Sequence, residues 1–191
     1  GIDEVKVEAW LNANIEGAQG PYTYELIAGG RSNITFRVTD ANGMQLVLRR
    51  PPMGHVLATA HDMAREHRII SAVGKTNVPV PRTLGVCTDE DVNGAPFYVM
   101  AFVGGVVLDS PDKGLLLPEA LRTTAAENLI DVLADLHAVD IDAVGLGAIG
   151  IGTPGDIGRG KVSARDCAAT WRTSSPVSTT RRRTGRVSYF L

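Results

Sequence analysis

Residues 34–49 read ITFRVTDANGMQLVLR, and this stretch decides the fold. The run from Ile34 to Thr39 alternates in character and is rich in β-branched side chains, which is typical of a half-buried strand. Residues 40–43, DANG, have the composition of a tight turn, and the run from Met44 to Arg49 has a strand-like pattern again. Because strands joined by so short a turn pair antiparallel, the stretch predicts a β-hairpin.

Further strands are predicted on both sides of this hairpin. The run from Tyr24 to Ala28 has the composition of a strand and leads into Gly29-Gly30, so the first three strands form a meander. The runs from Thr83 to Cys87 and from Pro96 to Phe102 predict two more strands around a polar turn at residues 89–94. Together these runs predict a five-stranded antiparallel sheet.

Two helices are predicted next to this sheet. The first covers residues 3–15 and begins at Asp3, a residue type that caps helices well. The second runs from about residue 56 to residue 73, and Gly74 is expected to close it in the left-handed conformation, which costs glycine little. Segregated helices and an antiparallel sheet belong to the α+β class. We therefore assign residues 1–105 to a first domain of this class.

Another helix is predicted beyond Gly104-Gly105, which we interpret as a flexible joint. It begins at Pro118 and Glu119 and ends near His137. The apolar residues of this helix form one stripe and are Leu121, Ala125, Leu129, Val132, Leu133 and Leu136. Residues 106–153 are therefore assigned to the start of a second, helical domain.

The remaining residues, 154–191, differ in composition from the rest of the chain. Residues 157–191 hold eight of the 19 basic side chains and one of the 21 acidic ones, although the net charge of the whole chain is only -2. No apolar period is present there, so we interpret this segment as an atypical basic tail, either frameshifted or disordered. Only Tyr189 and Phe190 accompany the arginine run at 181–186, which argues against nucleic acid as a partner.

The composition of the chain excludes several classes of protein. With 191 residues, of which 44% are hydrophobic and 21% charged, the chain has enough apolar material for a buried core, which excludes whole-chain disorder. The longest mostly apolar stretch, residues 99–108, is interrupted by two glycines and is too short to cross a bilayer. Cys87 and Cys167 cannot make a disulfide framework, and no N-terminal signal is present. We therefore expect a cytoplasmic protein without a membrane partner.

Gly29, Gly30, Arg31, Ser32 and Asn33 lie between two predicted antiparallel strands. Backbone amides freed by the glycines would close over phosphate oxygens, and Ser32 would donate a hydroxyl. The same residues also suit an ordinary hairpin turn. From the local sequence, both interpretations stay open.

A cation and a carboxylate follow this loop. Arg49 ends the third predicted strand, and Glu66 lies on the helix after it. Kinase-like folds hold the α and β phosphates of a nucleotide with such a pair. Arginine binds phosphate bidentately but differs from lysine in reach and shape. Judged one at a time, the two residues are better explained as a solvated strand end and a surface glutamate.

The order of these segments resembles the aminoglycoside phosphotransferase family of kinase-like proteins. The resemblance covers about residues 3–153 and depends on the ordered set of motifs, since none is diagnostic by itself. The motifs are the glycine loop, Val47-Leu48-Arg49, Arg65-Glu66, Val78-Pro79-Val80-Pro81, Phe97-Tyr98-Val99-Met100, Gly104-Gly105 and Leu133-Ala134-Asp135-Leu136-His137-Ala138-Val139-Asp140. The most similar branch also occurs as the N-terminal domain of some multidomain acyl-CoA dehydrogenases. The resemblance implies a protein-kinase-like N-terminal lobe and the start of a helical C-terminal lobe.

The resemblance also implies a ligand and its site. The loop from Gly29 to Asn33 would cover the phosphates of a nucleotide, Arg49 would pair with them, and Glu66 would orient Arg49. The hinge that meets the adenine would consist of Met100, Ala101, Phe102 and Val103. The cofactor would be ATP with Mg2+, and the family reaction transfers the γ-phosphate of ATP to a small hydroxyl-bearing acceptor.

The catalytic part of this family is missing from the sequence. In the family, a His-Gly-Asp loop supplies the aspartate that accepts the hydroxyl proton, and a later asparagine and aspartate bind magnesium. None of the four histidines is followed by Gly-Asp. We therefore expect a truncated chain that binds nucleotide weakly at most and does not turn it over. The alternative is a non-catalytic nucleotide-binding or partner-binding module associated with acyl-CoA metabolism, and a partner chain or a second copy would cover the exposed apolar stripe.

Three further motifs match known sites in residue types but not in structural context. Residues 145–150, GLGAIG, follow a helix where a dinucleotide fingerprint follows a strand. Residues 155–162, GDIGRGKV, end in valine where a P-loop needs a hydroxyl. His61, Asp62 and His67 point in different directions on one predicted helix and cannot share a metal ion. We assign no site to these motifs.

Overall fold

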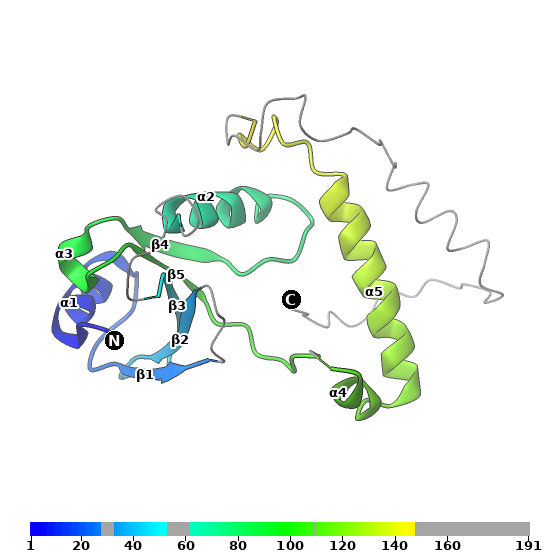
Figure 1. Cartoon of the computed structure of the whole chain (residues 1–191), viewed down its shortest axis with the longest axis horizontal. Coiled ribbons are helices and arrows are strands. Elements are labelled where there is room, and N and C mark those ends of the chain that lie inside the picture. The colour runs from blue at the N-terminus through cyan, green and yellow to red at the C-terminus, as the bar shows by residue number, and fades with distance from the viewer. Residues whose placement is uncertain (28–32, 53–61, 109, 148–191) are drawn as a thin grey trace. The chain divides into compact units, whose positions relative to one another are not determined.

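The computed structural model describes residues 1–27, 33–52, 62–108 and 110–147, and these residues fall into two compact units. The first unit, within residues 1–74 and 81–103, contains the elements α1 (Glu4–Asn14), β1 (Thr23–Leu26), β2 (Ile34–Thr39), β3 (Gln45–Arg50), α2 (Met63–Val73), β4 (Thr83–Cys87), α3 (Glu90–Asn93) and β5 (Phe97–Ala101) (Figure 1). The second unit holds residues 75–80 and the described chain from Gly104 on, with α4 (Pro111–Leu115) and α5 (Glu119–His137).

The five strands form one antiparallel sheet in the order β1-β2-β3-β5-β4. This arrangement confirms the predicted five-stranded sheet, in which the first three strands form a meander. Asp40 organises the turn between β2 and β3, because its carboxylate accepts the backbone N–H groups of Asn42 at 2.8 Å and Met44 at 2.7 Å. Gly43 has a φ of 83°, which favours glycine at that position of the turn.

Helix α1 covers one face of the sheet. Alternate residues of each strand point to this face, because neighbours along a strand face opposite sides. The ring of Trp10 packs edge-on against Phe97, with the ring centroids 4.9 Å apart. The buried cluster between helix and sheet consists of Val7, Leu11, Ile15, Tyr22, Val38, Leu46, Leu48, Cys87, Phe97 and Val99. Burial of this apolar surface is the main force that holds α1 on the sheet.

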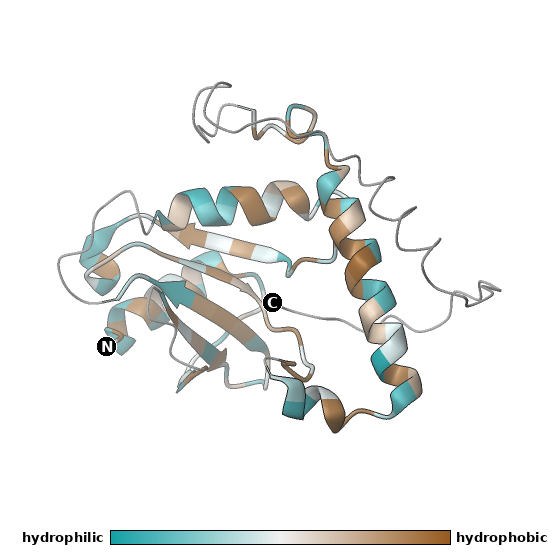
Figure 2. Cartoon of the chain, turned by 45° about the vertical axis from the view of Figure 1, so that its right-hand side comes forward, coloured by the Kyte–Doolittle hydropathy of each residue, from teal (hydrophilic) through white to brown (hydrophobic). Residues whose placement is uncertain are grey.

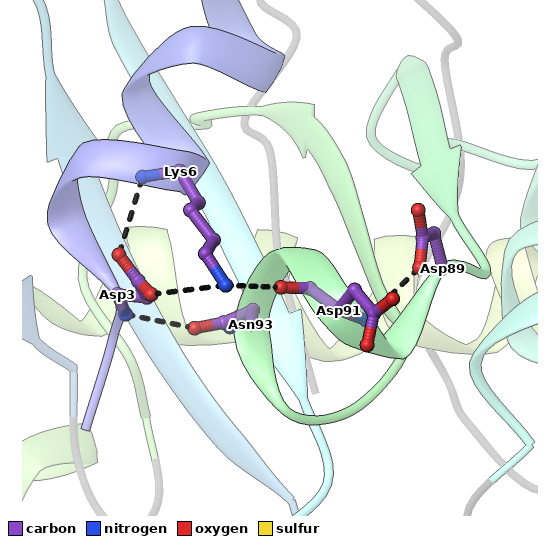
Figure 3. A network of polar contacts seen from close by, with 5 residues as sticks. All are labelled: Asp3, Lys6, Asp89, Asp91 and Asn93. Carbon is purple, nitrogen blue, oxygen red and sulfur yellow. Dashed lines mark hydrogen bonds and ion pairs between the residues drawn. The ribbon is translucent and has the colours of Figure 1, made fainter.

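A polar network ties the beginning of α1 to α3 (Figure 3). The backbone N–H of Asp3 donates to Asn93 Oδ1 at 3.0 Å, and Lys6 Nζ donates to the Asp91 carbonyl at 2.9 Å. The carboxylate of Asp3 accepts the Lys6 N–H at 3.2 Å, which confirms Asp3 as the N-cap of α1. Asp89 caps α3 in the same way. These contacts fix the connection between β4 and β5 to the first helix.

Helix α2 covers part of the opposite face, beside β4 and β5. Its first turn is fixed by Asp62, whose carboxylate accepts the Arg65 N–H at 2.9 Å. Near its other end, the hydroxyls of Ser71 and Thr83 are 2.7 Å apart and join α2 to β4. The predicted beginning of this helix near residue 56 lies outside the described residues.

Two expectations about chain turns are wrong. Gly74 ends α2 in the right-handed conformation, with a φ of -61°, because its N–H still donates to the Ile70 carbonyl at 2.8 Å and the helical pattern continues through it. The polar turn at residues 89–94 contains the short helix α3, which forms because Asp89 caps it and because Gly94, with a φ of 68°, ends it in the left-handed region. The sequence also does not predict α4.

In the second unit, α5 spans the predicted residues, with Pro118 at its N-cap. No residue of α5 is buried, and Leu121 and Leu133 each keep 48% of their surface exposed. Apolar and polar residues alternate along this helix in Figure 2. None of the described helices combines the length and the apolarity needed to cross a membrane. The basic tail assigned to residues 154–191 lies outside the described residues.

Candidate functional site

A row of polar side chains crosses the sheet on the face opposite α1. In the register of the strands, Thr35 of β2 lies opposite Arg49 of β3, and Arg49 lies opposite Tyr98 of β5. Residues paired in this way project to the same face of a sheet. The row is therefore presented on the side where α2 lies.

Glu66 in the first turn of α2 meets this row. Arg49 Nε donates to Glu66 Oε2 at 3.0 Å, which forms an ion pair between strand and helix. Tyr98 donates its hydroxyl to the same oxygen at 3.2 Å. On the other side of the carboxylate, Asn33 Nδ2 donates to Glu66 Oε1 at 2.8 Å. One carboxylate thus accepts hydrogen bonds from three side chains, each on a different segment of the chain.

The environment differs between the members of this cluster. Tyr98 is 1% exposed, and Asn33 is 5% exposed. Burial raises the pKa of the Tyr98 hydroxyl, and the nearby Glu66 charge raises it further, so Tyr98 stays a protonated donor at neutral pH. The side chains of Arg49 and Glu66 each keep 31% of their surface exposed. A ligand in solvent therefore has access to the guanidinium.

The guanidinium of Arg49 is held from two sides. Its Nε contacts Glu66, and its Nη1 donates to the Thr35 hydroxyl at 3.1 Å. No described residue accepts a hydrogen bond from its Nη2. A guanidinium fixed in this way is oriented for a planar, bidentate contact with an anion such as phosphate.

A second row on the same face is more apolar. Arg37 of β2 lies opposite Val47 of β3, and Val47 lies opposite Met100 of β5. Just after β5, the backbone N–H of Phe102 donates to the Gln45 carbonyl at 3.3 Å, so the sheet hydrogen bonding extends to this residue. The guanidinium of Arg37 lies over the Phe102 ring, 5.6 Å from its centroid.

The predicted site residues are distributed as follows. Asn33, Arg49 and Glu66 come together in one cluster. Met100 and Ala101 belong to β5, and Phe102 and Val103 follow it directly. Gly29, Gly30, Arg31 and Ser32 lie outside the described residues. The binding roles assigned to all of these residues stay predictions.

Thr35, Arg37 and Tyr98 are members of this face that sequence reasoning missed. Their places depend on the pairing of strands that are far apart in the sequence, above all β3 with β5. Tyr98 stands in the quoted motif Phe97-Tyr98-Val99-Met100, but nothing local in that motif connects it with Arg49. Only the register of the sheet does so.

His67 lies beside the cluster. Its ring packs edge-on against Tyr98, with the centroids 6.2 Å apart, and burial lowers its pKa. In the part of the chain that the structure describes, no group of three or more histidine, cysteine, aspartate or glutamate side chains could hold a metal ion.

Comparisons with known proteins identify a family and a similar fold. The family model that matches residues 23–172 describes the phosphotransferase enzyme family. A crystal structure of a "putative aminoglycoside phosphotransferase" from Ralstonia eutropha JMP134 is similar in fold, with a TM-score of 0.66 and 32% sequence identity. The similarity covers 93% of this chain and 50% of that one.

Several longer proteins contain a similar segment. Acyl-CoA dehydrogenase family member 10 of Mus musculus is 37% identical over 125 residues, which are 64% of this chain and 11% of the mouse protein. Acyl-CoA dehydrogenase family member 11 of Gallus gallus is 32% identical over 177 residues, which are 90% of this chain and 21% of the chicken protein. The chain thus spans only a small part of the length of these curated relatives.

Proposed function

This chain belongs to the phosphotransferase enzyme family, and from that membership we propose that its sheet binds ATP through Arg49. The kinase-like fold is that of an aminoglycoside phosphotransferase, and the family domain occurs within proteins named as acyl-CoA dehydrogenases. The transfer of the γ-phosphate of ATP to a small hydroxyl-bearing acceptor is the reaction that we propose for the complete site.

The observation that carries this proposal is the ion pair between Arg49 and Glu66. Kinase-like folds bind the α and β phosphates with a cation on a strand that is held by a carboxylate on a helix. Here the cation is arginine, and its accessible guanidinium has the donors for two phosphate oxygens. Phosphate chemistry therefore suits the described residues.

The adenine would lie on the apolar row of the same face. Val47 and Met100 are apolar and lie on the same face as Arg49, and the hinge assigned to residues 100–103 begins at Met100. Magnesium would accompany the nucleotide phosphates. Among the described residues we assign no ligand for this ion, since they contain no metal-binding cluster.

Binding of Mg-ATP to the 191-residue chain, measured by calorimetric titration, tests the proposal. We expect Arg49→Ala to weaken binding by about tenfold or more, since a hydrogen bond to a charged group contributes about 1.5–3 kcal/mol. Arg65→Ala is the matched control. Arg65 is an exposed arginine next to Glu66 in the sequence, and its substitution removes the same charge. If Arg49→Ala and the parent chain bind Mg-ATP equally, the proposal is wrong.

For the 191-residue chain itself we propose binding without turnover. The sequence contains no His-Gly-Asp loop, so a base for the acceptor hydroxyl and a set of metal ligands are missing from these residues. A phosphoryl-transfer assay with labelled ATP and a panel of small alcohols should therefore give no product above background. Substantial product that depends on Arg49 would contradict this second proposal and support the first.

A non-catalytic role is the second candidate. The names of the relatives favour it, since the matched segment is a small part of proteins called acyl-CoA dehydrogenases. In that case the chain would act by binding a nucleotide or a partner in acyl-CoA metabolism. Binding of Mg-ATP without transfer by the 191-residue chain agrees with both candidates, whereas transfer that depends on Arg49 would exclude the non-catalytic role.

A further inference from the structure

The proposed function assigns no role to the hydroxyl of Tyr98. Tyr98 is on β5 between two neighbouring strands, where it pairs with Arg49 of β3 and Val86 of β4. Its side chain is 1% exposed, and its hydroxyl reaches the same oxygen of Glu66 that Arg49 contacts. We propose that Tyr98 is a positioning residue: it holds Glu66 so that Glu66 presents the Arg49 guanidinium to a nucleotide phosphate.

The two partners of this hydrogen bond differ in conformational freedom. Glu66 has a long side chain on the surface of a helix, is about one-third exposed, and would otherwise sample several rotamers. Tyr98 is fixed by the two flanking strands, and the ring of His67 packs edge-on against it. A rigid donor therefore meets a flexible acceptor. The donor sets the geometry of the contact.

The donors are distributed over both oxygens of the Glu66 carboxylate. Asn33 binds Oε1 at 2.8 Å, and Tyr98 binds Oε2 at 3.2 Å. Two donors on different oxygens fix the rotation of the carboxylate about its last torsion. Arg49 then takes its own bond to Oε2 at a defined angle. Without Tyr98, Oε2 would be held by Arg49 alone, and its position would follow the guanidinium instead of a rigid donor.

This inference depends on the proposed function, because it concerns how Arg49 is presented to phosphate. A merely structural role for Tyr98 makes a different prediction. If the hydroxyl of Tyr98 only forms a hydrogen bond in the core, its removal would lower folding stability. It would not affect the binding of a ligand with phosphates more than the binding of one without them. A positioning residue acts through Arg49 and therefore affects only the phosphate-dependent part of binding.

The experiment compares Mg-ATP with adenosine on the full 191-residue chain. We expect Tyr98→Phe to weaken Mg-ATP binding by about fivefold to tenfold and to leave adenosine binding within about twofold of the parent chain. Tyr24→Phe is the matched control, because the buried Tyr24 hydroxyl has no hydrogen-bond partner among the described residues and the substitution removes the same atom. Equal losses for both ligands, or no loss for Mg-ATP, would overturn the inference.

A second measurement needs no ligand. The 1H–15N resonance of the Arg49 Nε–H group reports its bond to Glu66, and we expect Tyr98→Phe to shift it while Tyr24→Phe leaves it in place. An unshifted resonance would overturn the inference whatever the nucleotide result. A parent chain that fails to bind Mg-ATP would instead overturn the proposed function. The same measurement on Glu66→Gln approaches the contact from the helix side if the tyrosine variant does not fold.

Discussion

Replacing Glu66 with alanine would remove the acceptor that three side chains share. The change removes one hydrogen bond from the Tyr98 hydroxyl and one from the Asn33 amide, at residues that are 1% and 5% exposed. A buried donor that loses its partner costs about 1–3 kcal/mol. Arg49 is about one-third exposed and can turn to water, so its share is below about 1 kcal/mol. We therefore expect Glu66→Ala to lower the free energy of unfolding by about 2–4 kcal/mol.

Urea unfolding followed by tryptophan fluorescence would measure this loss. In a Trp171→Phe background, Trp10 is the remaining tryptophan, and its contact with Phe97 makes it a probe of the same unit as Glu66. With a slope of about 1–3 kcal/mol per molar urea, the midpoint should fall by roughly 1–2 M.

Glu66→Gln is the matched control for this prediction. It keeps one carbonyl oxygen as an acceptor, and the Asn33 amide can turn so that its own oxygen accepts from the new amide. We expect this variant to lose only about 1 kcal/mol. If Glu66→Ala unfolds within about 0.5 kcal/mol of the parent chain, the three hydrogen bonds do not stabilise the fold and the reasoning is refuted.

Two further predictions concern the fold around the site. Leu48 is completely buried against α1, so Leu48→Ala should lower the free energy of unfolding, measured in urea, by about 3–4 kcal/mol. Leu26 is 56% exposed, and Leu26→Ala should change this free energy by less than about 0.5 kcal/mol. Similar losses for both variants would contradict the assigned core. Burial lowers the pKa of His67, so the unfolded chain takes up the proton first and stability should fall as the pH drops below about 6.5. Between about pH 7.5 and pH 5, the unfolding midpoint should fall less for His67→Gln than for the control His137→Gln. An equal fall for both variants would contradict the prediction.

Much of the fold could be predicted because its signals are local. The alternation of residues 34–39, the turn chemistry at Asp40 and Gly43, and the cap at Asp3 each act within a few residues. The pairing of a strand arginine with a helix carboxylate was also within reach, because kinase-like folds combine these residue types in this order. The structure brings Arg49 and Glu66 to 3.0 Å.

The parts that sequence reasoning missed depend on distant pairing. Tyr98 lies next to Arg49 only because β5 inserts beside β3, while β4, which precedes it in the chain, takes the edge of the sheet. No local period reports such an order of strands. The conformation of Gly74 was mispredicted for a related reason, since a single glycine after a helix permits the left-handed region without requiring it.

Strand β3 serves the core and the site with neighbouring residues. Leu48 faces α1, and Arg49 faces Glu66, so a shift of the strand by one position would bring a charge into the core and a leucine to the place beside Glu66. A one-residue slip of β3 against its neighbours should therefore disrupt the apolar core and the ion pair with Glu66 at the same time.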